Sequence, residues 1–188
     1  MKLKYCILIV TVLFINRAHA HTGSMVKNYS DTTKWLSYTD TAYQFSFKYP
    51  SNWQLKLPNT NTRFFITSYT ENDADNFREN INCIVRKLDE QNFDIKTVET
   101  AVKESLAEKL KDFKLLSSGY IKWNNVTALL LDYTATTESN GVTYKIRIRQ
   151  QMAVLNDNLF TITYTAETAS YDKYLPAIKK IIQSLKAE

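Results

Sequence analysis

Four segments with β-strand character, separated by short turn signals, constrain the fold of this chain more than any other feature. The segments are Lys114–Trp123, Val126–Thr137, Val142–Leu155 and Leu159–Glu167, and the turn signals between them are Asn124-Asn125, Asn140-Gly141 and Asp157-Asn158. Asn-Gly is the strongest short hairpin signal, because both residues tolerate a positive φ. We therefore predict that the four segments are antiparallel neighbours. A two-residue turn at Asn140-Gly141 then places Arg149 directly opposite Asp132.

Shorter strands precede this region. Aromatic residues alternate with polar ones from Tyr43 to Tyr49, and Pro50 closes the run. Such alternation is typical of a strand with one buried face. The same period predicts three more short strands, around Trp53–Leu57, Phe64–Ser68 and Ile81–Val85, and Trp35–Tyr38 is a candidate edge strand.

Two amphipathic helices complete the pattern. Apolar residues spaced by three and four from Ile95 to Leu110 predict a helix with one apolar stripe, and Asp94 stands where an N-cap is useful. A second such helix runs from Tyr171 to Leu185, with Pro176 either starting its main part or kinking it. Helices with one apolar stripe dock on a sheet, so we predict an α+β fold: an antiparallel β-sheet flanked by helices, an α/β/α sandwich. The apolar run Leu129–Leu131 indicates a strand covered on both faces.

Several short motifs follow one another in the order of a known family. They are Tyr49-Pro50-x-x-Trp53, the strand Asn80–Val85, the helix with Leu106 and Leu110, and the ending Tyr171-x-x-Tyr174-Leu175-Pro176 with Ile181–Lys186. On these residues the chain resembles the PsbP/Mog1-like family, whose bacterial members include the DcrB-like envelope proteins. The resemblance covers roughly residues 38–186.

The resemblance implies an antiparallel sheet between helices and a role in binding. Members of the family serve as extrinsic photosystem subunits, a nuclear GTPase-binding factor, bacterial envelope proteins that affect phage entry, and chaperones of secreted toxins. Because the shared motifs are apolar or turn residues that specify the fold, the resemblance assigns no functional residue to this chain.

The N-terminus has the order of a secretory signal peptide. Lys2 and Lys4 precede an apolar run from Tyr5 to Ile15, and Ala18-His19-Ala20 fits an A-x-A cleavage site. The run is too short to span a bilayer, which takes about 20 residues. We therefore expect residues 1–20 to be removed, residues 21–37 to form a flexible leader and residues 38–188 to form a single domain. The mature protein is then periplasmic or secreted and has no transmembrane anchor.

Cleavage also changes the charge. The chain has 24 Lys and Arg against 19 Asp and Glu; loss of Lys2, Lys4 and Arg17 leaves 21 basic residues and a net charge of about +2. Nucleic-acid binding, which needs a concentrated basic patch, is not predicted. The mature chain keeps one cysteine, Cys83, so it forms no intramolecular disulfide. The alternation of Cys83 with Ile81 and Val85 predicts a buried thiol.

Catalytic chemistry has few groups to draw on. After cleavage the only histidine is His21, in the leader, whereas acyl transfer by a serine or cysteine nucleophile needs a base held beside it. The sequence contains no Gly-rich phosphate loop, CxxC or HExxH motif. We therefore predict that the protein is not an enzyme and has no cofactor.

Two sets of residues are candidates for contact with a partner. A row of cations, Lys145, Arg147 and Arg149, shares one side of a strand at period two. It is either a charged sheet face or edge, or a docking surface for anions in which Lys145 and Arg147 contact a partner's carboxylates or a lipid phosphate. Tyr120 and Trp123 flank a turn and are either core residues or an interface anchor.

One acidic loop is a candidate cation site. Glu71, Asp73 and Asp75, with Glu79 further on, supply the carboxylate oxygens that calcium prefers, but the segment lacks the glycine and spacing of an EF-hand loop. A solvated acidic loop is the alternative.

The sequence thus predicts an exported, non-catalytic binding or adaptor domain whose partner is another envelope or secreted protein. The alternative is a periplasmic protein that binds a small molecule or a cation in a pocket between sheet and helix. The sequence leaves the oligomeric state open.

Overall fold

The computed structural model describes residues 34–187, except 43, 59–60, 73–74 and 89–93. Two helices, α1 (Ile95–Lys109) and α2 (Tyr171–Ser184), accompany strands arranged in two sheets. The strands are β1 (Trp35–Asp40), β2 (Phe45–Pro50), β3 (Gln54–Lys56), β4 (Thr62–Thr67), β5 (Asn80–Lys87), β6 (Lys111–Trp123), β7 (Val126–Ser139), β8 (Val142–Leu155), β9 (Asn158–Glu167) and β10 (Lys186–Ala187). The predicted α+β class is confirmed.

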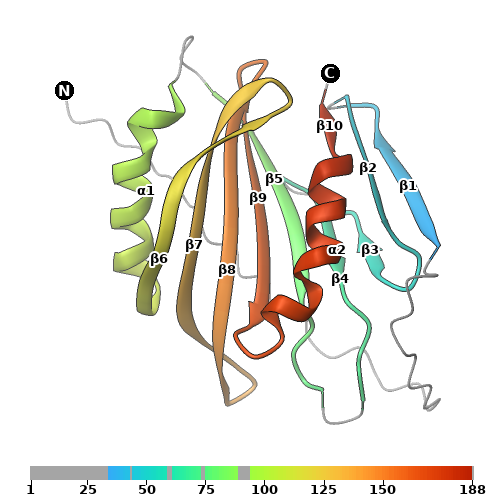
Figure 1. The fold of residues 1–188 in the computed structure, drawn as a ribbon, viewed down its shortest axis with the longest axis vertical. Helices are drawn as coiled ribbons and strands as arrows, with labels where there is room; N and C mark the ends of the chain where they lie inside the picture. Colours follow the sequence, from blue (N-terminus) through green and yellow to red (C-terminus); the bar gives the residue numbers. More distant parts are fainter. Residues whose placement is uncertain (1–33, 43, 59–60, 73–74, 89–93, 188) are drawn as a thin grey trace.

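The large sheet has seven strands in the order β3-β4-β5-β9-β8-β7-β6, and every neighbouring pair is antiparallel. The strands predicted as neighbours, β6 to β9, lie side by side as expected (Figure 1). A second sheet of three strands, β1-β2-β10, was not predicted. It forms because β10 pairs with β2 directly after α2, and a strand of two residues leaves no periodic signal.

Three tight turns set the register of β6 to β9. Positive φ angles occur at Asn124 and Asn125, at Asn140 and Gly141, and at Asn156 and Asp157. Two successive positive φ values are the requirement of a type I′ hairpin turn. The first two turns are those predicted; the third lies one residue before the predicted Asp157-Asn158, because Asn158 already pairs with Leu155. The predicted pairing of Asp132 with Arg149 is confirmed.

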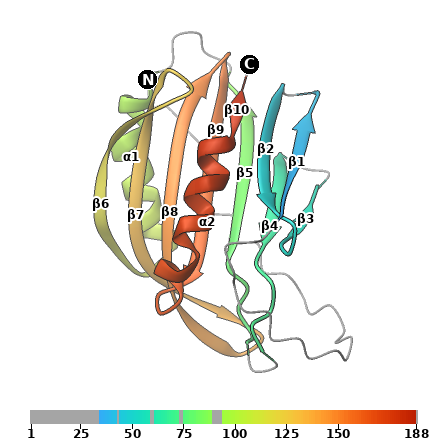
Figure 2. The ribbon, with the colours of Figure 1, turned by 45° about the vertical axis from the view of Figure 1, so that its right-hand side comes forward.

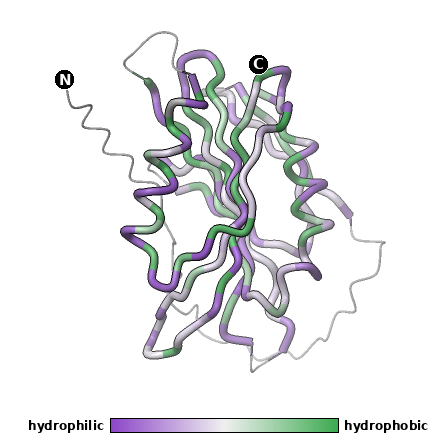
Figure 3. Tube along the Cα trace, turned by 60° about the vertical axis from the view of Figure 1, so that its left-hand side comes forward, coloured by the Kyte–Doolittle hydropathy of each residue, from purple (hydrophilic) through white to green (hydrophobic). Residues whose placement is uncertain are grey.

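The two helices lie on opposite faces of the large sheet (Figures 1 and 3). The predicted N-cap of α1 is confirmed, since the Asp94 carboxylate accepts a hydrogen bond from the backbone N–H of Lys96 at 3.0 Å. Helix α2 begins at Tyr171 with Ser170 as its N-cap residue, so Pro176 lies inside the helix and does not start it.

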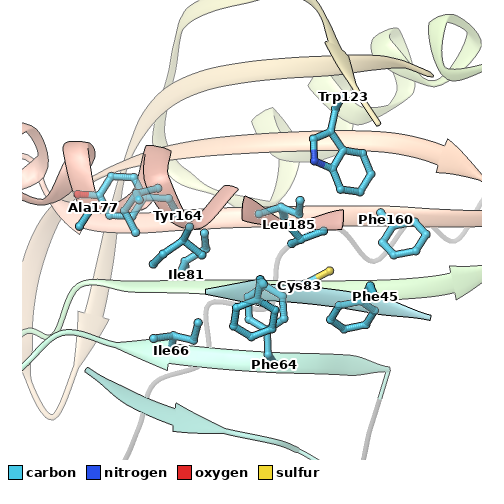
Figure 4. Close-up of a cluster of buried hydrophobic side chains, with 14 of the residues drawn as sticks. Phe45, Phe64, Ile66, Ile81, Cys83, Trp123, Phe160, Tyr164, Ala177 and Leu185 are labelled. Atoms are coloured by element: carbon cyan, nitrogen blue, oxygen red, sulfur yellow. The ribbon is translucent and has the colours of Figure 1, made fainter. Parts of the chain in front are cut away.

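The large sheet separates two hydrophobic cores. The α1 core joins Val98, Val102 and Leu106 of the helix to strands β7 and β8, with the buried sheet residues Leu129, Leu131, Tyr133, Ala135, Ile146, Ile148 and Met152. The α2 core joins that helix and β2 to strands β4, β5 and β9, with the buried residues Phe45, Phe47, Phe64, Ile66, Ile81, Cys83, Val85, Phe160, Ile162, Tyr164, Tyr171, Tyr174, Ile178 and Ile181 (Figure 4). Leu129 and Leu131 are fully buried on the α1 side, whereas Leu130 is only half-buried on the other, so the prediction that this run is covered on both faces holds in part.

Two further expectations concern single positions. Cys83 is buried in the α2 core, as predicted, and burial raises the pKa of its thiol above the ordinary value. Strand β1 begins at Trp35, upstream of the expected domain boundary at residue 38, because residues 35–40 pair with β2. The segment Trp35–Ser37 therefore belongs to the fold; residues 21–33 lie outside the described part of the chain.

Replacing Leu106 with alanine tests the α1 core. Leu106 is fully buried, so Leu106→Ala removes packing that the surrounding residues only partly refill and lowers the free energy of unfolding by about 2–5 kcal/mol. Urea unfolding followed by circular dichroism measures the loss. Glu108→Ala, at an exposed position of the same helix, is the control and changes stability by less than about 0.5 kcal/mol. Equal stability of the two variants would contradict the assignment of this core.

Candidate functional site

Each helix covers only part of the large sheet. Helix α1 packs on β6, β7 and β8, whereas α2 lies on the opposite face and packs on β9 and on β2. Within the described part of the chain, the side of β6 to β8 that faces the same way as α2 therefore carries no helix over much of its length (Figures 1 and 2). We call this surface the open face. Its register positions are Ser117, Gly119 and Ile121 of β6, Leu130, Asp132, Thr134 and Thr136 of β7, and Lys145, Arg147 and Arg149 of β8.

Asp132 lies at the centre of the open face and is only 2% exposed. Arg147 donates two hydrogen bonds to its carboxylate, from Nε at 2.7 Å and Nη2 at 3.2 Å. Arg149 donates two more, at 3.3 and 3.1 Å. The Tyr171 hydroxyl of α2 donates a fifth at 3.1 Å, so one carboxylate joins two sheet arginines to the first residue of the helix.

These contacts keep Asp132 ionised. Burial by itself raises the pKa of this carboxyl, but the hydrogen bond and charge of Arg147, the Tyr171 hydroxyl and the charge of Arg149 outweigh it. The pKa of Asp132 consequently lies below its ordinary value. The guanidinium of Arg147 also stacks over the Tyr171 ring, 4.1 Å from its centroid. The cluster fastens the N-terminal end of α2 to the sheet.

The two cations predicted to meet a partner thus differ in their surroundings. Arg147 is committed to Asp132 and Tyr171, and its guanidinium also lies 3.9 Å from Asp172. Lys145 is exposed, and among the described residues no ion pair of its side chain is found. Lys145 is therefore the cation of this row that a partner reaches at least cost.

The two aromatic candidates for an interface anchor also differ in exposure. Tyr120 is 41% exposed on the α1 side of β6, where its hydroxyl donates to the Glu99 carboxylate. This hydrogen bond is the main reason that the pKa of Tyr120 is raised to about 12. Trp123 is only 7% exposed, and its ring packs 5.7 Å from that of Phe160 in the α2 core (Figure 4). Of the two alternatives for Trp123, the structure therefore shows the core position, because β6 turns its end toward the core.

The acidic loop is tied to α2. Glu71 accepts hydrogen bonds from Lys173, at 2.5 Å, and from the Tyr174 hydroxyl, and these lower the pKa of its carboxyl. Asp75 accepts from the backbone N–H groups of Glu71 and Phe77 at 2.9 and 3.2 Å. Asp73 lies outside the described residues. Nowhere in the described part of the chain do three or more His, Cys, Asp or Glu side chains gather so that they could hold a metal ion.

Glu79 forms a second buried contact at the same end of α2. Its carboxylate accepts hydrogen bonds from the hydroxyl of Ser68, at 3.2 Å, and from that of Ser170, the N-cap residue of the helix. Burial raises the pKa of Glu79 above its ordinary value. Three carboxylates from separate parts of the chain, Glu71, Glu79 and Asp132, thus meet the first residues of α2. Sequence reasoning missed this convergence, because partners 39 to 103 residues apart leave no periodic signal.

Comparison with known proteins gives one family and several similar folds. The family model described as PsbP matches residues 33–187. Among solved structures, the cyanobacterial PsbP (CyanoP) of Synechocystis sp. PCC 6803 superposes with a TM-score of 0.61 at 13% identity, covering 88% of this chain and 98% of that one.

Two other structures share the fold. LpqN, a protein involved in cell envelope biogenesis of Mycobacterium tuberculosis, gives a TM-score of 0.53 at 14% identity over 84% of this chain and 86% of its own. The Saccharomyces cerevisiae Ran-binding protein Mog1p gives 0.55 at 10% identity over 83% and 96%. A search of curated proteins finds no match.

The Asp132 cluster predicts a specific pH dependence. Because the pKa of Asp132 is lowered in the folded protein, its contribution to stability is complete above the unfolded pKa of about 3.9 and is lost as the pH falls through the folded value. Asp132→Asn removes that contribution, so it costs about 1–3 kcal/mol at pH 7, and the difference from the parent protein shrinks below about pH 4. Urea unfolding at a series of pH values measures it.

Glu138→Gln is the matched control, since Glu138 is an exposed residue of β7. It is expected to leave stability unchanged at every pH. A deficit for Asp132→Asn that stays constant between neutral and acid pH would contradict an ionised, arginine-bound carboxylate.

Proposed function

Because the chain belongs to the PsbP family, whose members are generally non-catalytic, we propose that it is an exported, non-catalytic adaptor domain that contacts another envelope or secreted protein. The signal-peptide pattern of residues 1–20 supports export. The fold shared with LpqN, which is involved in cell envelope biogenesis, is consistent with the same compartment. Among bacterial members of the family, the DcrB-like envelope proteins are the group with which we associate the chain.

The observation that carries the proposal is the open face of β6 to β8. Its backbone is held by strand pairing on both sides of β7 and β8, and the Asp132 cluster fixes its polar side chains. Exposed on it are Ile121, at 37%, and the cation Lys145. The two side chains lie toward opposite ends of this face, because Ile121 pairs with Ala128 of β7 and Lys145 pairs with Thr136. An extended surface that offers an apolar contact and a charge, and that does not need to rearrange, suits recognition of a protein.

The available side chains support binding rather than catalysis. Both histidines of the chain, His19 and His21, precede the described residues, and Cys83 is buried with a raised thiol pKa. A buried, protonated thiol is a poor nucleophile. Within residues 34–187 as described, neither helix combines the length and apolar character needed to cross a bilayer.

Export is tested on the N-terminus of the mature protein. When the full-length gene product is expressed with its own N-terminus in a Gram-negative host, cleavage after Ala20 leaves a chain that begins at His21. Fractionation followed by N-terminal sequencing measures this. Recovery of intact Met1 in the cytoplasmic fraction would refute export.

Partner contact through the open face is tested by charge reversal. Lys145→Glu should weaken binding of the native partner about fivefold, or ~1 kcal/mol, because an attractive rim charge becomes repulsive. Capture from the exporting organism by cross-linking, followed by titration of the purified pair, provides the measurement. Lys179→Glu, at an exposed position on α2, is the control with the same charge change. Thermal unfolding of both variants should match that of the parent protein, and equal affinity of the two would exclude Lys145 from the contact.

A further inference from the structure

Strand β6 forms one edge of the large sheet. Among the described residues its only strand neighbour is β7, so alternate backbone N–H and C=O groups point away from the sheet (Figure 1). The first part of the strand is interrupted twice, by register shifts between Lys111 and Lys114 and between Leu115 and Ser117. Such bulges protect an edge from pairing. From Ser117 to Trp123 the register runs without a shift, and we call this stretch the β6 edge segment.

The side chains around this segment leave room for another strand. Leu116, Tyr120 and Ile121 are 45%, 41% and 37% exposed, an unusual concentration of large apolar side chains on an edge. Apart from Gly119 and its two chain neighbours, no atom of the described residues lies within 4 Å of the position that a Cβ would take on Gly119, so the middle of the segment is open to an incoming side chain. Tyr120 stands on the α1 side of the strand and Ile121 on the opposite side, so a strand added here meets an apolar contact on each face.

Helix α1 holds the segment in place. The Tyr120 hydroxyl donates to Glu99, and Lys103 donates both to Glu99, at 2.5 Å, and to the Ser118 hydroxyl at 2.8 Å. Two residues of the segment are thus tied to one turn of the helix. A strand that is already fixed loses little conformational entropy when a partner pairs with it.

The charge of the edge points to the chemistry of the occupant. Strand β6 carries three lysines and a single acidic residue, Asp112: Lys122 lies inside the β6 edge segment, and Lys111 and Lys114 lie in the part that precedes it. A segment rich in Asp or Glu complements these lysines, whereas a basic segment is repelled. The opposite edge of the sheet, β3, has only three residues and offers much less backbone.

We propose that an extended, acidic segment of a partner protein adds to the large sheet as an additional strand beside the β6 edge segment. Backbone hydrogen bonds supply the affinity. On the open face, Ile121 and the space beside Gly119 select apolar side chains, and on the α1 side Lys122 selects acidic ones, so the preferred segment alternates apolar and acidic residues. The inference rests on the proposed function, since it requires a protein partner, and it names the partner's chemistry and its mode of binding.

The test uses the mature chain and a synthetic peptide of alternating valine and glutamate. Titration followed by amide hydrogen exchange should show binding with new protection confined to residues 117–123. A version of the peptide is N-methylated on those amides that point to one side of the extended peptide. Through that side it should bind β6 at least about tenfold more weakly than the unmethylated peptide, because it lacks several backbone hydrogen-bond donors. The lysine analogue of the peptide should also bind more weakly, and the difference should shrink at high salt.

Lys122→Glu, with Lys179→Glu as its control, should reduce affinity for the glutamate peptide severalfold at unchanged thermal stability. Any of four results would overturn the proposal. They are no binding of the glutamate peptide, binding of the methylated peptide as tight as that of the unmethylated one, binding of the lysine peptide as tight as that of the glutamate peptide, and protection on a strand other than β6. These outcomes are independent of the Lys145→Glu result. Partner capture that depends on Lys145 together with an unprotected β6 would leave the adaptor function standing and reject strand addition.

Discussion

The structure depends on how two helices share the two faces of one seven-stranded sheet. Each helix has a single apolar stripe and can bury only part of one face. Helix α1 covers β6 to β8 on one side; α2, with the small sheet, covers mainly the other half on the opposite side. The strands β7 and β8 therefore carry apolar residues toward α1 and polar residues on most of their other face. The open face results directly from this division.

A polar sheet face beside a core boundary needs its charges paired. Asp132 is buried where α2 begins, and an isolated carboxylate there would be costly. Arg147, Arg149 and Tyr171 offset that cost, and the resulting cluster joins the helix to the sheet. Glu71 and Glu79 add further links at the same helix end. Arg147 and Arg149, which resemble a docking surface in the sequence, thus mainly hold α2 against the sheet. Lys145 and the apolar side chains near β6 remain for contact with a partner.

The hairpin region shows what local patterns can predict. Paired residues able to take a positive φ located two of the three turns, and the Asn140-Gly141 turn correctly placed Arg149 opposite Asp132. The third turn was displaced by one residue, because Asn156, Asp157 and Asn158 all favour turns and only the pairing of Leu155 with Asn158 decides between them. Strand β10 was missed, and the choice between core and interface for Trp123 stayed open, for a different reason. Their positions depend on residues far away in the sequence, namely β2 and Phe160.

The amino-acid sequence by itself determined the class of fold, the strand neighbours β6 to β9, the two amphipathic helices and the buried position of Cys83. These features follow from periodicity and turn chemistry, which act over a few residues. Only the tertiary structure decided which sheet face each helix covers, which groups bind Asp132, and which stretch of the sheet edge has no strand partner among the described residues. Those outcomes depend on contacts between residues tens of positions apart, and no local pattern of side chains encodes which distant partner satisfies a buried charge.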